Sequence, residues 1–390
     1  MPVAPAFMPR TAAWNLPDSP WILHAGLVMF ADIDDFVDVQ AQSTVRFDAR
    51  LLGLRVLGDG PRTPHWIAAE DTRRDYLAYR AALATGRGST WLRRRLRDRP
   101  PVVLHAHYGT IAARLTHLAR HLEVPLVGSF YGYDTSLTSL VESRRWRARY
   151  RRLFHAGSAF LVEGPALAAK VEALGCDPAK LHLIRLPANE IGLARCRRAA
   201  PDRFVVSAAG RFVEKKGFDT AIKAFARGLH DKPDAELVLV GGGELDDALH
   251  RLARDEGVEE RVTWYGKLPF ETYTNTAAAA SLAIFPSRRA ANGDAEGGGL
   301  MTLIELQWLG VPSIVSDHDD LPYTAAPELP VLPPTDVDAW AETLRHYYDH
   351  PGELDALGEA GRRFVHEHHT IAQNVAARED VYTSLIRSRS

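Results

Sequence analysis

Short runs of apolar, β-branched residues alternate along the chain with segments whose apolar residues recur every three or four positions. The short runs are typical of buried strands, and the three-to-four spacing is typical of amphipathic helices. Their regular alternation indicates parallel βαβ units with helices on both faces of a sheet. Helices are predicted over Thr110–His121 and Ser139–Phe154. The strands predicted in the first half are Trp21–Ala25, Leu54–Leu57, Val102–His105, Pro125–Phe130 and Ala159–Val162.

The pattern starts again in the second half. The strands predicted there are Phe204–Ala208, Leu237–Val240, Val262–Tyr265, Leu282–Pro286, Ser313–Ser316 and Val331–Leu332. A polar stretch of small residues over Ala194–Arg203, just after Pro187, interrupts the periodicity. We therefore expect an α/β chain with one Rossmann-like domain over residues 1–188 and a second over 189–370. Residues 371–390 follow the complete second sheet, and we expect this helical segment to pack back on the first domain.

Composition narrows the class of protein. A chain of 390 residues favours two domains, and a formal net charge of −2 lacks the basic excess of a nucleic-acid binder. Two cysteines, Cys176 and Cys196, are few for a secreted protein of this size. No stretch approaches the roughly 18 apolar residues of a membrane helix, and the N-terminus lacks an apolar leader segment. These features favour a soluble, cytoplasmic protein.

A glycine-rich segment just before a predicted helix is the first candidate site. Gly297, Gly298 and Gly299 allow backbone N–H groups to approach an anion, and the helix N-terminus adds partial positive charge. Glu296 precedes the glycines and Glu305 lies one to two turns into the helix. Two carboxylates at different heights suit the hydroxyls of a sugar.

The loop after the strand Phe204–Ala208 is the second candidate site. It carries Arg211 and Lys216 between glycines, at the strand end where α/β sheets bind ligands. Arginine chelates a phosphate with two N–H groups and lysine supplies a point charge. Two cations at this place suit a diphosphate.

Three motifs identify a family resemblance. They are Gly210-Arg-Phe-Val-Glu-Lys-Lys-Gly217, Val240-Gly-Gly-Gly-Glu244 and Glu296-Gly-Gly with Glu305 and Gly310-Val-Pro312. Together they resemble the retaining GT-B glycosyltransferases of family 4, in the Glu-Gly-Gly form found among exopolysaccharide and natural-product enzymes. The first half matches more loosely, through His105-Ala-His-Tyr-Gly109 and Phe130-Tyr-Gly-Tyr-Asp134.

The resemblance assigns roles to residues of the second domain. It makes Arg211 and Lys216 the clamp on the donor diphosphate, Glu305 the carboxylate that holds the ribose, and Glu296 the acid facing the donor sugar. The other residues that it places on the donor are Gly210, Gly297, Gly298, Gly299, Leu300 and Lys267. Eight residues separate the two glutamates, where the commonest form of the motif has seven. Leu300 and Met301 also depart from the family, which usually has a proline there.

One position of the first domain departs chemically from the family. Where its members commonly have a histidine that reaches the donor sugar, this chain has Tyr131. A tyrosine donates a hydrogen bond but does not become a cation near neutral pH. His107, on the preceding strand-end loop, is the alternative residue for that role.

The resemblance implies a GT-B fold, in which two Rossmann-like domains face each other across a cleft. It implies transfer of a hexosyl unit, with retention, from a UDP- or GDP-sugar to the hydroxyl of a small soluble acceptor such as a nucleoside or aminocyclitol. The nucleotide sugar is then a co-substrate, and neither a further cofactor nor a metal is expected. The alternatives are a lipid-linked saccharide as acceptor, a GT-B sugar-nucleotide epimerase or hydrolase, and a non-catalytic sugar-nucleotide sensor.

Other motifs have plainer interpretations. We interpret Asp32-Ile-Asp34 as a chance match to a metal motif of another glycosyltransferase fold, and His366-Glu-His-His369 as a solvated helix end. Asp246 stands where a dinucleotide fingerprint beginning at Gly241 needs its third glycine. Residues 91–152 hold thirteen arginines against four acidic residues. We favour the solvated face of ordinary helices over contact with a membrane surface there, because no broad apolar stripe accompanies the charge.

Overall fold

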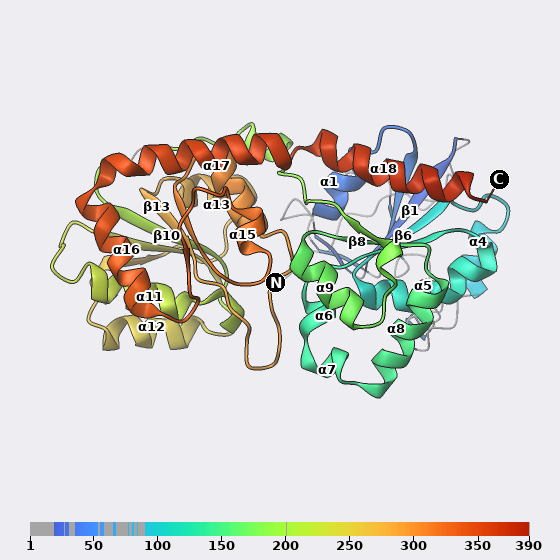
Figure 1. Cartoon of the computed structure of the whole chain (residues 1–390), viewed down its shortest axis with the longest axis horizontal. Helices are drawn as coiled ribbons and strands as arrows, with labels where there is room; N and C mark the ends of the chain where they lie inside the picture. The colour runs from blue at the N-terminus through green and yellow to red at the C-terminus, as the bar shows by residue number, and fades with distance from the viewer. Residues whose placement is uncertain are drawn as a thin grey trace, which may run out of the picture. The chain divides into compact units, whose positions relative to one another are not determined.

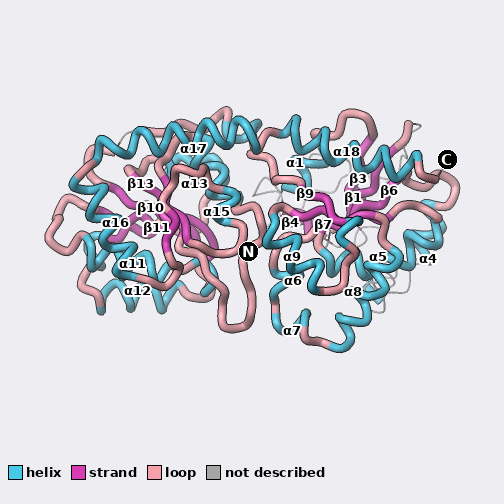
Figure 2. Tube along the Cα trace, viewed as in Figure 1, coloured by secondary structure: helices cyan, strands magenta, loops and turns pink. Residues whose placement is uncertain are grey.

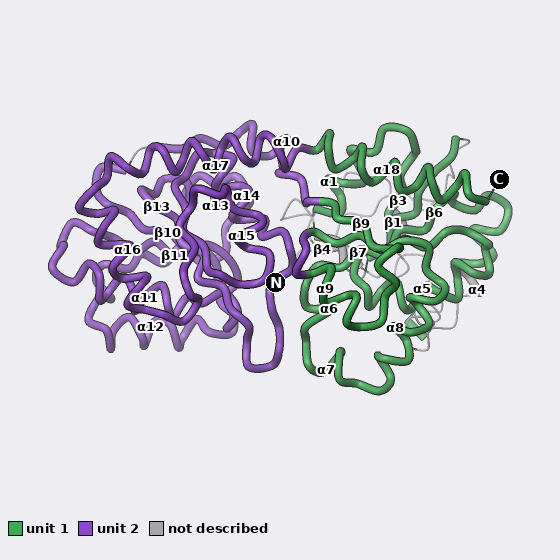
Figure 3. The backbone as a smooth tube through the Cα atoms, in the orientation of Figure 1, with its two compact units in different colours: residues 1–163, 167–184, 371–390 green, residues 164–166, 185–370 purple. Residues whose placement is uncertain are grey.

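The computed structural model describes residues 19–26, 28–30, 36–53, 55–57, 65–67, 77, 80, 81, 84, 90–199 and 201–389. The chain divides into two compact units (Figure 3). Unit 1 comprises residues 1–163, 167–184 and 371–390, and unit 2 comprises 164–166 and 185–370. The main division after residue 184 lies close to the boundary predicted after residue 188, and the C-terminal segment belongs to unit 1.

Unit 1 is built on a parallel sheet of seven strands in the order β5-β3-β1-β6-β7-β8-β9. Its strands are β1 (Trp21–Ala25), β3 (Asp48–Gly53), β5 (His65–Ile67), β6 (Val103–His107), β7 (Leu126–Ser129), β8 (Ala159–Val162) and β9 (Leu181–Leu183). A small separate sheet pairs β2 (Val28–Phe30) with β4 (Arg55–Leu57). The helices are α1 (Phe36–Gln42), α4 (Thr90–Leu96), α5 (Gly109–Leu122), α6 (Tyr133–Ser136), α7 (Thr138–Val141), α8 (Arg144–Ala156), α9 (Pro165–Ala173), which begins in unit 2, and α18 (Ile371–Arg387), with a 3₁₀ turn at Pro178–Lys180.

Helices cover both faces of this sheet (Figure 1). On one face Leu104 and Phe130 pack against residues of α5 and α8 such as Leu115 and Leu153. On the other face Val381 and Tyr382 of α18 join residues of the central strands. The last helix of the chain therefore completes the core of unit 1.

Unit 2 contains a parallel sheet of six strands in the order β12-β11-β10-β13-β14-β15. Its strands are β10 (Val205–Arg211), β11 (Glu236–Gly242), β12 (Val262–Trp264), β13 (Leu282–Phe285), β14 (Ser313–Ser316) and β15 (Val331–Leu332). The helices are α10 (Glu190–Leu193), α11 (Phe218–Gly228), α12 (Asp246–Asp255), α13 (Phe270–Ala278), α14 (Met301–Trp308), α15 (Leu321–Thr324), α16 (Val337–Asp349) and α17 (Leu354–His368), with 3₁₀ turns at Glu214–Lys216, Glu259–Arg261 and Pro351–Glu353.

Helices lie on both sides of the sheet of unit 2 (Figure 2). An apolar layer fills the space between sheet and helices on each side. Phe225 of α11 and Trp340 of α16 are fully buried on one face, and Leu303 and Leu306 of α14 are fully buried on the other. The strand order is that of a doubly wound Rossmann sheet, 3-2-1-4-5-6. The predicted fold class is thereby confirmed, with a Rossmann-like arrangement in each unit.

Several predicted elements differ from the observed ones. The predicted helix Ser139–Phe154 is two helices, because the Ser143 hydroxyl accepts the N–H of Trp146 and begins α8 there. His107 ends strand β6 and does not lie on the loop after it. Strands β2, β3, β5 and β9 were missed, since β3 begins with polar residues and the other three are only three residues long. Asp32-Ile-Asp34 lies outside the described residues.

Gly217 supplies a test of the backbone beside the candidate site. It precedes α11 with a φ of 67°, and a Cβ there would lie 1.9 Å from the Pro286 carbonyl oxygen. Gly257 has nearly the same φ, 69°, with nothing within 4 Å of a Cβ. We expect Gly257→Ala to destabilise the chain by about 1 kcal/mol through the left-handed backbone alone. Gly217→Ala should cost about 1 to 3 kcal/mol more, because the carbonyl must also move.

Denaturant unfolding of the two variants measures the difference. Because the φ values match, equal losses of unfolding free energy would show that the Pro286 carbonyl does not restrict position 217.

Candidate functional site

Two cations follow strand β10 in unit 2. Arg211 is the last residue of the strand and is exposed. Lys216 closes the 3₁₀ turn that follows, and its Cε atom would lie 3.7 Å from a Cβ on Gly210. Lys216 therefore runs back alongside the end of the strand, so that the loop gathers both cations at the carboxyl edge of the sheet.

A buried ion pair joins this loop to the loop after β13. The Lys216 Nζ lies 2.8 Å from the Glu296 Oε1, and only 12% and 9% of these side chains are exposed. The Ser287 hydroxyl donates to the same Glu296 oxygen at 3.2 Å. Because β10 and β13 are neighbours at which the strand order reverses, the pair lies at the switch point where open α/β sheets bind ligands.

Lys215, the neighbour of Lys216, strengthens the same cluster. Its ammonium donates to the Asp294 carboxylate and to the Ala295 carbonyl, both at 3.1 Å, and lies 4.0 Å from the Glu296 Oε2. Burial acts to raise the pKa of Glu296, but the charges of Lys216 and Lys215 outweigh it and hold that pKa below its ordinary value. Glu296 is therefore a carboxylate at neutral pH.

The three glycines lead directly into α14. Leu300 is the N-cap residue and no side chain caps this helix, while the Gly298 carbonyl accepts a hydrogen bond from the Thr324 hydroxyl. A Cβ on Gly299 would lie 3.0 Å from a methyl carbon of Leu186. Three residues without side chains thus precede the N-terminus of α14, and this arrangement favours binding of an anion or a polar ligand.

Glu305 is the fifth residue of α14 and is 5% exposed. It accepts a hydrogen bond from the Tyr273 hydroxyl of α13. Burial and the charge of Glu305 together raise the pKa of Tyr273 well above its ordinary value. Tyr273 therefore stays a donor and fixes one face of the carboxylate.

A side chain of the loop after β11 hydrogen-bonds the backbone of that loop. The Asp246 carboxylate accepts the Gly243 N–H at 3.0 Å, in the place where a dinucleotide fingerprint would have glycine. Lys267, after β12, has its Cγ 3.6 Å from where a Cβ on Gly242 would lie. Lys267 thus lies beside the end of β11, the strand that pairs with β10.

In unit 1, Asp134 links the two sequence motifs. One carboxylate oxygen accepts the Gly109 N–H at 2.7 Å, and the other accepts the N–H groups of Tyr131 and Gly132 at 3.2 and 3.1 Å. Burial raises the pKa of Asp134 to about 6, although these backbone N–H bonds oppose the rise. Its carboxylate sets the position of the loop that carries Tyr131.

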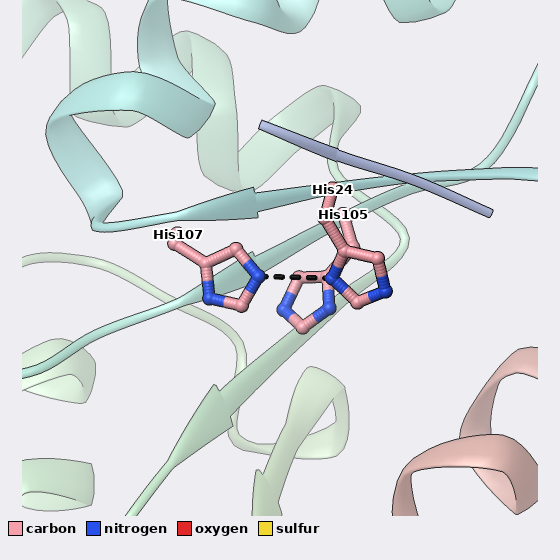
Figure 4. A group of neighbouring side chains, drawn as sticks. All are labelled: His24, His105 and His107. Carbon is pink, nitrogen blue, oxygen red and sulfur yellow. Dashed lines mark hydrogen bonds between the residues drawn. The ribbon is translucent and has the colours of Figure 1, made fainter. Parts of the chain in front are cut away.

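Three fully buried histidines of strands β1 and β6 lie close together (Figure 4). His24 of β1 and His105 of β6 are in register across the two neighbouring strands, and His107 ends β6. The His24 Nδ1 lies 3.0 Å from the His107 Nε2, and the His107 Nδ1 lies 2.7 Å from the Tyr131 hydroxyl. Tyr131 and His107 therefore belong to one hydrogen-bonded assembly.

The same three histidines have ring nitrogens within 4.8 Å of one another, which is close enough for them to be ligands of one metal ion. The His24 and His107 ring centroids are 5.3 Å apart while the bonded nitrogens are 3.0 Å apart, so these two atoms lie between the rings and point at each other. Zinc ligands at about 2.0 to 2.1 Å instead converge on a point beside the line that joins them. Both nitrogens of His105 are also bonded to hydroxyls, of Tyr382 and Ser129. The geometry fits a hydrogen-bonded network better than a metal centre.

Sequence reasoning missed several members of both clusters. His24 carried no motif, and its signal was only its place near the end of the first strand. Lys215 was not singled out from the sequence, but it is 7% exposed and its ammonium donates hydrogen bonds to Asp294 and Ala295. The prediction of a solvated helix end was wrong for His369, which is buried with its Nδ1–H donated to the Leu186 carbonyl at 2.7 Å. Burial lowers the pKa of His369 to about 4.

Two protein-family models match different parts of the chain. Residues 196–364 match the family described as "Glycosyl transferases group 1", and residues 37–187 match "Glycosyl transferase 4-like domain". A relative in Corynebacterium glutamicum, a GDP-mannose-dependent monoacylated alpha-(1-6)-phosphatidylinositol monomannoside mannosyltransferase, is 37% identical over 163 residues, which are 41% of this chain and 42% of the relative. The matched segments span about half the length of the curated relatives.

Solved structures show the same fold. Sucrose-phosphate synthase from Thermosynechococcus elongatus aligns with a TM-score of 0.73 at 18% identity, over 95% of this chain and 100% of that one. Anabaena HepE in complex with UDP aligns with a TM-score of 0.71 at 13% identity, over 93% and 100% of the two chains. Among the described residues, no helix is long and apolar enough to cross a membrane.

The raised pKa of Asp134 predicts a pH dependence of stability. Between about pH 4, the ordinary pKa of an aspartate, and about pH 6, the folded chain keeps a proton that the unfolded chain has released. The free energy of unfolding should therefore decrease as the pH rises through this window, by about 3 kcal/mol from this group.

Denaturant unfolding at several pH values, for the wild type and Asp134→Asn, isolates the effect. The asparagine variant should lack this part of the slope. The same slope in both proteins would mean that Asp134 ionises alike in the folded and unfolded chains.

Proposed function

We propose that this chain, which carries a glycosyl transferase 4-like domain and a group 1 glycosyl transferase domain, moves a hexosyl unit from a nucleotide-diphosphate sugar to an acceptor hydroxyl with retention at the anomeric carbon. UDP and GDP are the two candidate donor nucleotides. The observation that carries the proposal is the Lys216–Glu296 pair at the switch point of unit 2, beside Arg211. In this pair, Lys216 would face the leaving diphosphate and Glu296 would face the sugar.

The two cations would hold the donor diphosphate. Negative charge grows on the leaving diphosphate as its bond to the sugar breaks, and preorganised cations stabilise it most in that state. Arg211 is exposed, whereas Glu296 holds Lys216 in place before any donor binds. Lys216 would therefore act without further reorganisation.

The glycine loop and α14 would hold the rest of the donor. Gly297, Gly298 and Gly299 place backbone next to the sugar and phosphate, and Glu305 would accept hydrogen bonds from the ribose hydroxyls. Gly210, Leu300 and Lys267 would complete the donor site. The side chains at this site position and neutralise charge, and none is an activated serine or cysteine. This favours a front-face mechanism in which the leaving phosphate oxygen helps to deprotonate the acceptor, with Arg211 and Lys216 in the place of a metal ion.

Unit 1 would contribute to the sugar and the acceptor. We propose that the Tyr131 hydroxyl donates a hydrogen bond to a sugar hydroxyl, with His107 behind it. A small soluble acceptor such as a nucleoside or an aminocyclitol is the first proposal for the incoming hydroxyl.

A lipid-linked acceptor is the second candidate, and one feature of unit 1 favours it. Helix α8 exposes Arg144, Arg145, Arg147, Arg151 and Arg152 along its length. A cationic helix attracts anionic headgroups. The printed name of the Corynebacterium relative also includes a phosphatidylinositol mannoside.

A transfer assay tests the proposal and separates the acceptor classes. The protein is incubated in excess EDTA with UDP- or GDP-hexoses and either soluble acceptors or a phosphatidylinositol mannoside in detergent, and new glycosides are sought by mass spectrometry. We expect one donor to give a glycoside without a divalent ion. Consumption of donor without any glycoside would indicate an epimerase or hydrolase, and unchanged donor with measurable binding would indicate a sensor.

Lys216→Ala and Arg211→Ala should each reduce turnover more than donor affinity. Losing one contact to the developing charge costs about 3 kcal/mol of barrier, or roughly a hundredfold in rate. The matched control is Arg227→Ala, which removes an exposed arginine of α11 whose partner is Asp338 on the surface. Steady-state kinetics and thermal unfolding are measured together. Wild-type turnover in both site variants would remove the diphosphate clamp from the proposal.

Glu305→Ala should reduce donor affinity more than turnover. Ribose hydroxyls gain no charge in the transition state, so the loss should appear as weaker donor binding at nearly unchanged turnover. Calorimetric titration with UDP and GDP measures the binding. A large fall in turnover at unchanged affinity would assign Glu305 to the reacting centre instead.

A further inference from the structure

The histidine cluster of unit 1 joins Tyr131 through two hydrogen-bonded chains. The first chain runs from the His24 Nδ1 to the His107 Nε2 at 3.0 Å, and from the His107 Nδ1 to the Tyr131 hydroxyl at 2.7 Å. The second runs from the Tyr382 hydroxyl to the His105 Nδ1 at 2.6 Å, and from the His105 Nε2 to the Ser129 hydroxyl at 2.7 Å. Ser129 in turn hydrogen-bonds Tyr131.

All three histidines are neutral, so each carries one ring proton. Burial lowers the pKa of His24 and of His105 well below the ordinary value and lowers that of His107 to about 3. The guanidinium of Arg378 on α18 lowers all three further. Since one proton is shared between two nitrogens of each ring, the direction of every bond in the chains depends on which nitrogen holds it.

His24 fixes the direction of the first chain. Its Nε2 is buried and has no hydrogen-bond partner among the described residues. A buried N–H without a partner is rarer than a buried acceptor without one, and the positive charge of Arg378 favours a lone pair over a proton. The proton of His24 is therefore on Nδ1.

The remaining bonds of the first chain follow from this assignment. The His24 Nδ1–H donates to the His107 Nε2, so the single proton of His107 is on its Nδ1. That N–H then donates to the phenol oxygen of Tyr131.

The second chain ends on the same oxygen. The His105 Nδ1 faces the Tyr382 hydroxyl on α18, the helix that also carries Arg378, and the positive charge of Arg378 favours a lone pair there over a proton. The proton of His105 is therefore on Nε2 and is donated to the Ser129 oxygen, which leaves the Ser129 hydroxyl proton for the Tyr131 oxygen.

Both lone pairs of the Tyr131 oxygen are then occupied, and its own O–H is left to donate. We infer that His24, His107 and Ser129 are positioning residues that make Tyr131 an obligate hydrogen-bond donor to the sugar substrate. Tyr131 is half-buried while the three histidines are fully buried, so the unused direction of its hydroxyl is the one away from the network. The role in turnover rests on the proposed function, but the direction of the bonds does not.

Nitrogen-15 NMR of histidine-labelled protein tests the directions without any substrate. We expect His24 and His107 as the Nδ1–H tautomer and His105 as the Nε2–H tautomer, assigned by single His→Asn variants. Addition of Zn²⁺ should leave these signals in place. An Nε2–H tautomer at His107, or stoichiometric changes of all three rings with Zn²⁺, would overturn the inference.

Kinetics test the positioning role. His24→Leu removes the donor to His107, whereas His24→Asn places an amide N–H near the position of Nδ1. We expect His24→Leu to reduce kcat roughly five- to a hundredfold at unchanged donor KM, and His24→Asn to recover most of it. In the Tyr131→Phe background His24→Leu should cause no further loss, because the hydroxyl through which it acts is gone.

Thermal unfolding separates this role from a structural one. If the effects of His24→Leu and Tyr131→Phe on kcat multiply, or if His24→Asn is as inactive as His24→Leu while equally stable, the positioning role is wrong. Should His24→Leu not fold, Ser129→Ala in the same Tyr131→Phe cycle makes the same test. Absence of any transfer activity would refute the proposed function alone, since the NMR result decides the network.

Discussion

The reversal of strand order beside the first strand of each sheet is the constraint on which both polar clusters depend. In unit 2 the order reverses between β10 and β13, and the loops leaving these strands carry Lys216 and Glu296. In unit 1 it reverses between β1 and β6, which carry His24 and His107. Because connections leave a switch point in opposite directions, the strand ends there stay uncovered by their own crossovers. Each unit places a cluster of hydrogen-bonded polar side chains there.

The two clusters offset the free-energy cost of burying polar groups in different ways. Buried charge is stable only when paired, and unit 2 pairs a carboxylate with two ammonium groups and a serine hydroxyl. Unit 1 keeps its imidazoles neutral instead, since burial and the nearby Arg378 both disfavour their charged form. Asp134 in unit 1 accepts backbone N–H groups, and burial raises its pKa although these bonds oppose the rise. The cluster at the switch point of unit 2 is therefore held by paired charges, and the histidine cluster of unit 1 by neutral hydrogen bonds.

The sequence predicts most of unit 2 and less of unit 1, for physical reasons. Strands such as β11 and β13 contain short continuous apolar runs, Leu237–Val240 and Leu282–Phe285, so the hydrophobic pattern alone finds them. Strand β3, by contrast, begins with Asp48 and Arg50, and a half-polar strand looks like a loop. The Arg211 and Lys216 motif was visible because loop residues next to glycines stand out locally. His24 could not be found, because its partner at position 107 is 83 residues away and only the strand pairing joins them.

The difference between the two clusters bears on Tyr131, where this chain has a tyrosine and the family that it resembles commonly has a histidine. A histidine at position 131 would add a group able to become a cation near neutral pH, whereas a tyrosine there supplies a neutral hydroxyl. In this chain the imidazole lies one step behind, at His107, where burial holds its pKa at about 3. It cannot share the charge of a leaving diphosphate, but it can fix the direction of the Tyr131 hydroxyl. In the proposed reaction, Arg211 and Lys216 would stabilise the developing charge, and Tyr131 would orient the sugar.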